Sequence, residues 1–309
     1  MSAGHHDKHH GHDHSHPVPG GGGLAFPLAV ALNLGFVVTG IVAGLISGSV
    51  ALLADAAHNF SDVLSLLLAW GASVLAAKPP SARYTYGLKS SSILAAIANA
   101  ALLLVALGAI LVETIRHLAE PAPVEGGVMM VVAGIGIAVN GASAMLFAKG
   151  RKGDLNLRAA FQHLLADATV SAGVVVAGLL VWLTGQHWID PVTSLVITGV
   201  IGWGSLGLLR DAVKMGLLAV PEGIDENAVR AFLAGQPGVE AVHDLHIWPM
   251  STTETALTAH LVMPGGLPGD TFLHGLAHEL DHRFGVHHPT IQIETLGGAE
   301  CAFEDEAVV

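Results

Sequence analysis

Two stretches of the chain carry a histidine and an aspartate at the same spacing inside strongly apolar sequence. His58 and Asp62 form the first pair, and His163 and Asp167 form the second. Because residues four apart lie on one face of a helix, each pair presents an imidazole and a carboxylate together. Two such faces turned toward each other would supply two nitrogen and two oxygen ligands. Tetrahedral coordination by such ligands is typical of zinc, so the pairs predict a zinc site.

Each pair could instead be hydrogen-bonded internally and only hold two helices together. Ionisable side chains inside a membrane span are costly, however, and they usually mark a path for a substrate or an ion. The repetition of one spacing on two separate apolar segments therefore favours a metal or proton path. Asp55, one turn before His58, can be a helix cap, a partner of the ligands, a residue of the exit path or a ligand itself.

The apolar residues around these pairs are concentrated in runs long enough to cross a membrane. Hydrophobic residues make up 52% of the 309 residues and charged residues 12%, and this charged fraction is about half that of a soluble domain. A helix crosses the ~30 Å hydrocarbon layer in about 20 residues. We predict six spans: 24–46, 50–76, 88–116, 125–148, 157–183 and 187–208. The lipid bilayer is therefore the solvent of the first two thirds of the chain.

The basic residues around the spans lie almost entirely on one side of the membrane. With six spans both termini share a side, and Arg116 alone falls on the other. The side of the termini carries Lys8, Lys78, Arg83, Lys89, Lys149, Arg151, Lys152, Arg158, Arg210 and Lys214. Because positively charged loops are retained in the cytoplasm, both termini are expected there. The short loops and compact chain favour a bacterial inner membrane.

Beyond residue 208 the chain takes the pattern of a small α/β domain. Helical stretches near 225–235 and 270–284 alternate with strand-like runs at Val239–Trp248, Thr253–Met263 and Thr290–Thr295. This αββαβ order predicts one small sheet with helices packed on a face. The fold class is therefore an α-helical membrane protein with a cytoplasmic α/β domain.

Four parts follow from these patterns: a disordered His-rich tail (1–23), a six-helix transmembrane domain (24–208), the cytoplasmic α/β domain (209–296) and an acidic tail (297–309). The first part has seven histidines among Gly, Asp and Ser, a metal-binding composition rather than a targeting signal or an uninterrupted purification tag. The lone Cys301 cannot form an internal disulfide.

The net charge of −12 is concentrated in the last third of the chain. From Arg210 onward acidic residues outnumber basic ones by fifteen to four. Without a basic stripe or patch, nucleic acid is not expected as a partner. A strongly acidic, water-facing domain suits cations better.

One motif points to an enzyme instead. His278-Glu279-Leu280-Asp281-His282 matches the His-Glu-x-x-His helix of zinc metalloproteases, in which the glutamate is the general base. The motif falls in the small cytoplasmic domain, without an evident third ligand downstream, and proteolysis would leave both intramembrane pairs unexplained. We therefore interpret it as a solvated, charged helix face.

Four stretches together resemble the cation diffusion facilitator family. The run Ser49–Asp62 is similar to that family's second-helix signature, and His163–Asp167 is similar to its second half-site. Val242–Trp248 and Thr290–Glu294 resemble parts of its cytoplasmic domain. The resemblance covers about residues 24–296. It implies six transmembrane helices, a metallochaperone-like cytoplasmic domain, a homodimer, no enzyme activity and no organic cofactor.

The resemblance also implies efflux of a divalent cation in exchange for protons. Histidine at the first position of both pairs is similar to the zinc-preferring members, and imidazole ligands narrow the choice of metal. Cadmium, cobalt and nickel stay open as substrates. Some members carry a further metal site in the loop between the second and third spans. The matching stretch Ser81–Leu88 contains no His or Asp, so that site is expected to be missing.

By the same resemblance, zinc is expected in the cytoplasmic domain as a structural or regulatory ion. The matching positions are His243, His246, His260, His287 and Glu294. His243 and His246 are three apart on a predicted strand, so they should point to opposite faces and not share one ion from one chain. Zinc near the dimer interface would offset the repulsion between two acidic domains.

Two other classes of function stay open at this point. A membrane-anchored zinc sensor or buffer would bind zinc with the His-rich tail and the acidic domain, and its spans would serve only as an anchor. An anchor does not need charged residues inside the membrane, so the two His/Asp pairs disfavour this function. A passive channel is disfavoured, because a closed four-ligand site binds too tightly for channel rates. Alternating access about a midplane site fits better. The sequence therefore predicts a Zn²⁺/H⁺ antiporter that exports zinc from the cytoplasm.

Overall fold

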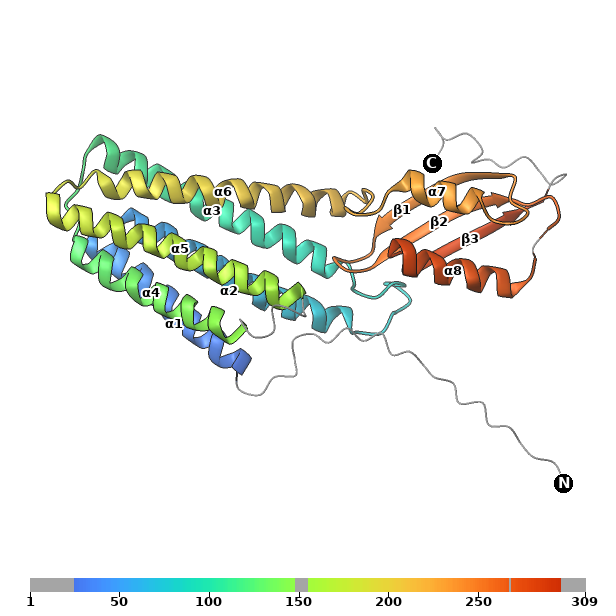
Figure 1. Ribbon diagram of the computed structural model, residues 1–309, viewed down its shortest axis with the longest axis horizontal. Helices are drawn as coiled ribbons and strands as arrows, with labels where there is room; N and C mark the ends of the chain where they lie inside the picture. Colours follow the sequence, from blue (N-terminus) through green and yellow to red (C-terminus); the bar gives the residue numbers. More distant parts are fainter. Residues whose placement is uncertain (1–24, 148–154, 267, 296–309) are drawn as a thin grey trace, which may run out of the picture.

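The computed structural model describes residues 25–147, 155–266 and 268–295. The predicted His-rich tail (1–23), the acidic tail (297–309) and several of the basic residues used for orientation lie outside these ranges. The described chain folds into a helical bundle and a smaller α/β domain at one end of it, as Figure 1 shows.

The bundle consists of six long helices. They are α1 (Ala25–Ser47), α2 (Val50–Ala76), α3 (Ser91–Ala119), α4 (Gly126–Phe147), α5 (Leu155–Thr184) and α6 (Ile189–Gly216). Helices α2 to α6 are long and apolar enough to cross a membrane, whereas the apolar part of α1 over which side chains are described, Asn33–Ser47, is shorter. Tight turns at Gly48 and Gly185, both at positive φ, join α1 to α2 and α5 to α6.

The predicted spans match these helices closely, with the largest difference at the end of α6. The prediction ended at residue 208, just before Arg210, whereas α6 continues to Gly216 and is closed by Leu217, whose N–H is bonded to the Val213 and Lys214 carbonyls. Charged residues begin where the helix leaves the apolar layer, so a hydropathy pattern marks that boundary and not the end of the helix.

Close packing of α1 on α2 depends on two glycines. A Cβ added to Gly40 would lie 3.1 Å from Cβ of Ala56, and one added to Gly44 would lie 2.8 Å from the side chain of Leu53. Small residues at this spacing let helix backbones approach each other within a membrane. The glycines therefore fix the position of α2, the helix that carries the first His/Asp pair.

The bundle has a buried core toward the end away from the α/β domain. Its apolar core there includes Leu52, Val124, Met129 and Val181, which lie near the turns that connect the helices at that end. All four side chains are almost completely buried. This part of the bundle forms a closed layer of buried side chains, mostly apolar but including Asp190 and Ser194.

The smaller domain has the predicted αββαβ order. Its elements are α7 (Glu226–Ala234), β1 (Ala241–Pro249), β2 (Thr255–Val262), α8 (Asp270–Phe284) and β3 (His288–Glu294). The sheet order is β1-β2-β3, with β1 antiparallel and β3 parallel to β2. Residues of both helices, among them Leu233 and Leu280, form one core with Leu257 and Leu261 of β2. Alternate residues of each strand point to the other face, which the helices do not cover.

The turn between β1 and β2 contacts the bundle at the start of α3. Lys89 forms an ion pair with Glu254, and Ser92 Oγ accepts a hydrogen bond from the Thr252 N–H at 3.1 Å. The ring of Tyr86 meets that of His288 edge to face, with centroids 5.5 Å apart. The α/β domain is thus joined to the bundle by polar contacts as well as by the chain after α6.

Candidate metal centre

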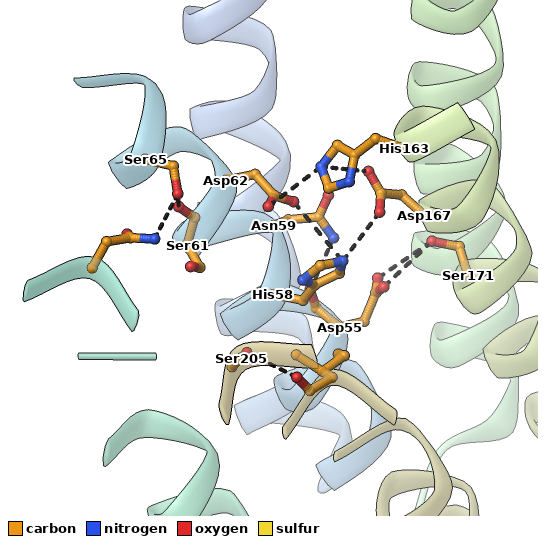
Figure 2. A network of polar contacts seen from close by, with 12 residues as sticks. Asp55, His58, Asn59, Ser61, Asp62, Ser65, His163, Asp167, Ser171 and Ser205 are labelled. Atoms are coloured by element: carbon orange, nitrogen blue, oxygen red, sulfur yellow. Dashed lines mark hydrogen bonds and ion pairs between the residues drawn. The ribbon is translucent and has the colours of Figure 1, made fainter. Parts of the chain in front are cut away.

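The four side chains of the two His/Asp pairs lie together between α2 and α5. His58 Nε2 is 3.1 Å from Asp167 Oδ1 and 4.0 Å from Asp62 Oδ2. His163 Nε2 is 3.4 Å from Asp62 Oδ1 and 3.6 Å from Asp167 Oδ2. Each imidazole therefore faces both carboxylates, and the pairs are joined across the helices as well as along them (Figure 2).

This spacing fits a small cation held by His58, Asp62 and Asp167, whose ligand atoms all lie within 4.8 Å of one another. His163 stands outside that group and would have to move closer to complete a four-ligand site. Ligands bound to zinc at about 2.0–2.1 Å in a tetrahedron lie about 3.3 Å from one another. The four distances from nitrogen to oxygen scatter around that value, from 3.1 to 4.0 Å. Protons on the imidazoles can hold the same groups together by hydrogen bonds, so the arrangement suits either a metal ion or protons.

The cluster is closed on one side and open on the other. The side chain of Asp167 is 4% exposed and that of His58 is 17% exposed, whereas Asp62 and His163 are 30% and 50% exposed. A cavity of about 340 Å³ is lined by all four residues and by polar groups of α2, α3 and α6, including Asn99. The more exposed ligands are therefore the ones that an arriving ion meets first.

A second cavity lies between this one and the α/β domain. It has a volume of about 290 Å³, shares Ser65 and Asn99 with the first and extends to Asp211 and Thr252 at the foot of the bundle. Where the two cavities meet, Asn99 Nδ2 donates a hydrogen bond to Ser65 Oγ at 2.6 Å. A path from the cluster to the side of the α/β domain would therefore pass the Asn99–Ser65 hydrogen bond.

Asp55 lies on the closed side of the cluster. Its buried carboxylate accepts a weak hydrogen bond from Ser171 Oγ, at 3.4 and 3.5 Å to its two oxygens, and its backbone carbonyl accepts one from Asn59 Nδ2. His163 Nε2 contacts both carboxylates of the cluster, whereas the Asp55 carboxylate contacts Ser171 on the neighbouring helix. Of the roles left open for Asp55, that of a partner beside the ligands fits best.

A second cluster of histidines and carboxylates lies on the uncovered face of the sheet. Glu294 bridges two histidines, with His243 Nε2 at 2.9 Å from one oxygen and His260 Nδ1 at 3.0 Å from the other. Asp244 in turn joins His260 Nε2 at 3.3 Å to His246 Nε2 at 2.9 Å. Three imidazoles and two carboxylates form one chain of contacts, a set of donors suited to zinc.

The prediction that His243 and His246 point to opposite faces is wrong. A β-bulge interrupts β1, so that His243 lies opposite His260 while His246 lies opposite Thr258. The extra residue resets the alternation of side chains, and both histidines therefore point to the same face. Asp244, at φ 49°, belongs to the bulge and was not predicted as a site residue. An aspartate inside a strand run, where left-handed backbone is tolerated, is the signal that could have indicated it.

His287 is not brought to this cluster. It follows α8, where its Nδ1 accepts a hydrogen bond from the Thr255 N–H at 3.2 Å and its Nε2 lies 3.9 Å from Asp281. Thr255 begins β2, whereas His260 stands near the other end of that strand. Within the described chain, four of the five predicted residues of the domain meet and His287 stands apart.

The bundle, the intramembrane cluster and the acidic domain together define an integral membrane protein that handles metal cations. The sequence matches the family model of the cation efflux transmembrane domain over residues 27–215, and that of the cation efflux protein cytoplasmic domain over residues 221–296. The chain therefore belongs to the cation efflux family, also called the cation diffusion facilitators, which are transporters and not enzymes.

Several relatives match over most of their length. The zinc transporter ZitB of Escherichia coli is 34% identical, over 86% of this chain and 85% of its own. The cadmium, cobalt and zinc/H(+)-K(+) antiporter of Bacillus subtilis is 32% identical, over 84% of this chain and 85% of its own. The cation efflux system protein CzcD of Alcaligenes is 32% identical, over 99% of this chain and 94% of its own.

Proposed function

We propose that this protein exports zinc from the cytoplasm in exchange for protons, and that His58, Asp62, His163 and Asp167 hold the zinc. The observation that carries the proposal is that each imidazole nitrogen lies within 4.0 Å of both carboxylates. The names of the relatives support it, since they describe a zinc transporter and an antiporter of cadmium, cobalt and zinc against H⁺ and K⁺.

The exchange follows from the chemistry of the ligands. Zinc binding requires neutral imidazoles and ionised carboxylates, so metal ions and protons compete for the same atoms. Zinc enters through the two cavities beside Asn99 and reaches Asp62 and His163 first. The bundle then rearranges so that the closed layer of buried side chains opens and the cavity closes. On the far side protons displace the ion, because a free imidazole titrates near pH 6.5.

The placement in the membrane follows from the same proposal. The α/β domain and both termini lie in the cytoplasm, since the basic residues gather on that side and the second cavity extends to Thr252 of that domain. The host membrane is the inner membrane of a bacterium. The functional unit is a homodimer, zinc is the main substrate, and cadmium, cobalt and nickel are weaker ones.

A flux assay with an imposed pH gradient tests the proposal. In proteoliposomes with an acidic lumen, we expect zinc to accumulate several-fold faster than in vesicles without a gradient, because protons leaving the lumen drive zinc inward. A protonophore should remove the difference. Equal rates with and without the gradient would exclude proton coupling, and no zinc flux in either condition would exclude transport.

We propose further that the cluster on the sheet binds zinc and draws two cytoplasmic domains together. Zinc there would neutralise part of the negative charge that two acidic domains bring to a dimer interface. Glu294 is the residue to change, because its carboxylate contacts both His243 and His260. We expect small-angle scattering of the full chain in detergent to show compaction when zinc is added, and Glu294→Gln to abolish it.

The matched control is Glu240→Gln. Glu240 lies just before β1 in the same domain, and its side chain is exposed. This variant should compact with zinc as the parent does. Compaction that persists in Glu294→Gln would show that the cluster does not mediate the pairing.

A further inference from the structure

The His-Glu-x-x-His stretch of α8 takes part in neither cluster. His278 and His282 lie one turn apart, with ring centroids 6.1 Å from each other and ring planes inclined by 53°. Leu276 and Leu280 are 3% and 0% exposed and pack toward the sheet. Since both histidines are exposed, their imidazoles project from the opposite side of the helix into solvent.

This placement argues against the protease interpretation of the motif. Glu279, the residue that would be the general base, is also exposed on the outer side of α8. A metalloprotease glutamate acts on a water molecule held by the metal within a substrate cleft. In the described part of the chain both imidazoles and Glu279 are exposed on α8, so the feature to explain is metal binding alone.

The two imidazoles are close to the geometry of a chelate. At metal–nitrogen distances of about 2.0–2.1 Å, two imidazoles on one tetrahedral ion have ring centroids about 5 Å apart. The observed 6.1 Å therefore requires a shift of about 1 Å, which side-chain rotation on an exposed helix face can supply. Asp281, three residues after His278 and also exposed, adds a negative charge on the adjoining side of the helix.

We propose that His278 and His282 form an exposed divalent-cation site on α8, distinct from the intramembrane cluster and from the cluster on the sheet. Imidazole donors select zinc and neighbouring transition metals over magnesium and calcium. Two protein ligands leave the remaining positions to water, so the ion is held weakly and exchanges readily. Such a site suits the capture of cytoplasmic zinc rather than a structural ion.

Chemical protection of single histidines tests the site in the full chain. Diethyl pyrocarbonate modifies the free nitrogen lone pair of neutral imidazole, which a bound metal occupies. With zinc at about four times the Kd of the site or above, we expect the modification of His278 and His282 to fall roughly fivefold or more, in proportion to the unoccupied fraction. The modification is read for each residue by peptide mass spectrometry. His288, an exposed histidine of the same domain, is the internal control and should keep its reactivity.

Two variants decide whether these two residues act as a pair. In His282→Asn the protection of His278 should be lost, whereas Glu279→Gln should keep it. The readout is the reactivity of one histidine and not zinc flux, so this test is separate from that of the proposed function. If zinc leaves His278 and His282 equally reactive in the parent, there is no such site. Protection of His278 that survives His282→Asn, through His274 or otherwise, would overturn the pairing.

Discussion

Asp167→Asn is expected to abolish zinc transport. The carboxylate of Asp167 contacts both imidazoles of the cluster, at 3.1 and 3.6 Å, and is 4% exposed. Removing one charge from a buried, hydrogen-bonded set costs about 3–5 kcal/mol. If zinc binding loses the same free energy, the affinity falls by roughly 100-fold to 4000-fold. Zinc flux into proteoliposomes under a pH gradient should therefore fall to the background of empty vesicles.

Asp62→Asn should also abolish zinc transport, and it should lower the stability of the bundle less than Asp167→Asn does. Its carboxylate contacts the same two imidazoles but is 30% exposed toward the cavity. The matched control is Glu113→Gln, a carboxylate of α3 that pairs with Arg116 and His117 outside the cluster, and this variant should transport normally. Folded Asp62→Asn and Asp167→Asn variants that transport like the parent would show that the carboxylates are structural, and zinc would need another route.

The intramembrane cluster could be predicted because its signal is local. A spacing of four residues places His58 beside Asp62 and His163 beside Asp167 on any helix, whatever the rest of the fold does. Because buried charge is costly inside a membrane, the two helix faces that carry these pairs are expected to turn toward each other. The structure brings them together, with His58 in contact with Asp167 and His163 in contact with Asp62.

Features set by pairing between distant segments could not be predicted in the same way. The direction of His246 depends on a bulge opposite β2, and strand periodicity alone gave the wrong face. The access path depends on α2 and α3 placing Ser65 against Asn99, two ordinary polar residues in apolar helices. Neither residue type nor spacing distinguishes them from residues that simply hold helices together.

Asp190 is a further residue that sequence reasoning did not single out. It stands in the first turn of α6, where an acidic residue commonly stabilises its own helix through the positive end of the helix dipole. Its carboxylate instead reaches the start of α2, where it accepts hydrogen bonds from Ser49 Oγ at 2.5 Å and from the Val50 and Ala51 N–H groups at 2.8 and 3.3 Å. The side chain is fully buried and so fastens α6 to the helix that carries His58.

Asp190→Ala is expected to destabilise the bundle strongly. It would leave two backbone N–H groups and a hydroxyl at the start of α2 without their carboxylate, in a site that water does not reach. Losing one partner of a buried charged network costs about 3–5 kcal/mol, and a domain of this size loses about 2–4 °C of melting temperature per kcal/mol. The apparent Tm in detergent should therefore fall by roughly 10 °C. The control is Asp211→Ala, which removes a half-buried carboxylate later in α6 and should shift the Tm little. An unchanged Tm in Asp190→Ala would show that α2 is held by packing alone.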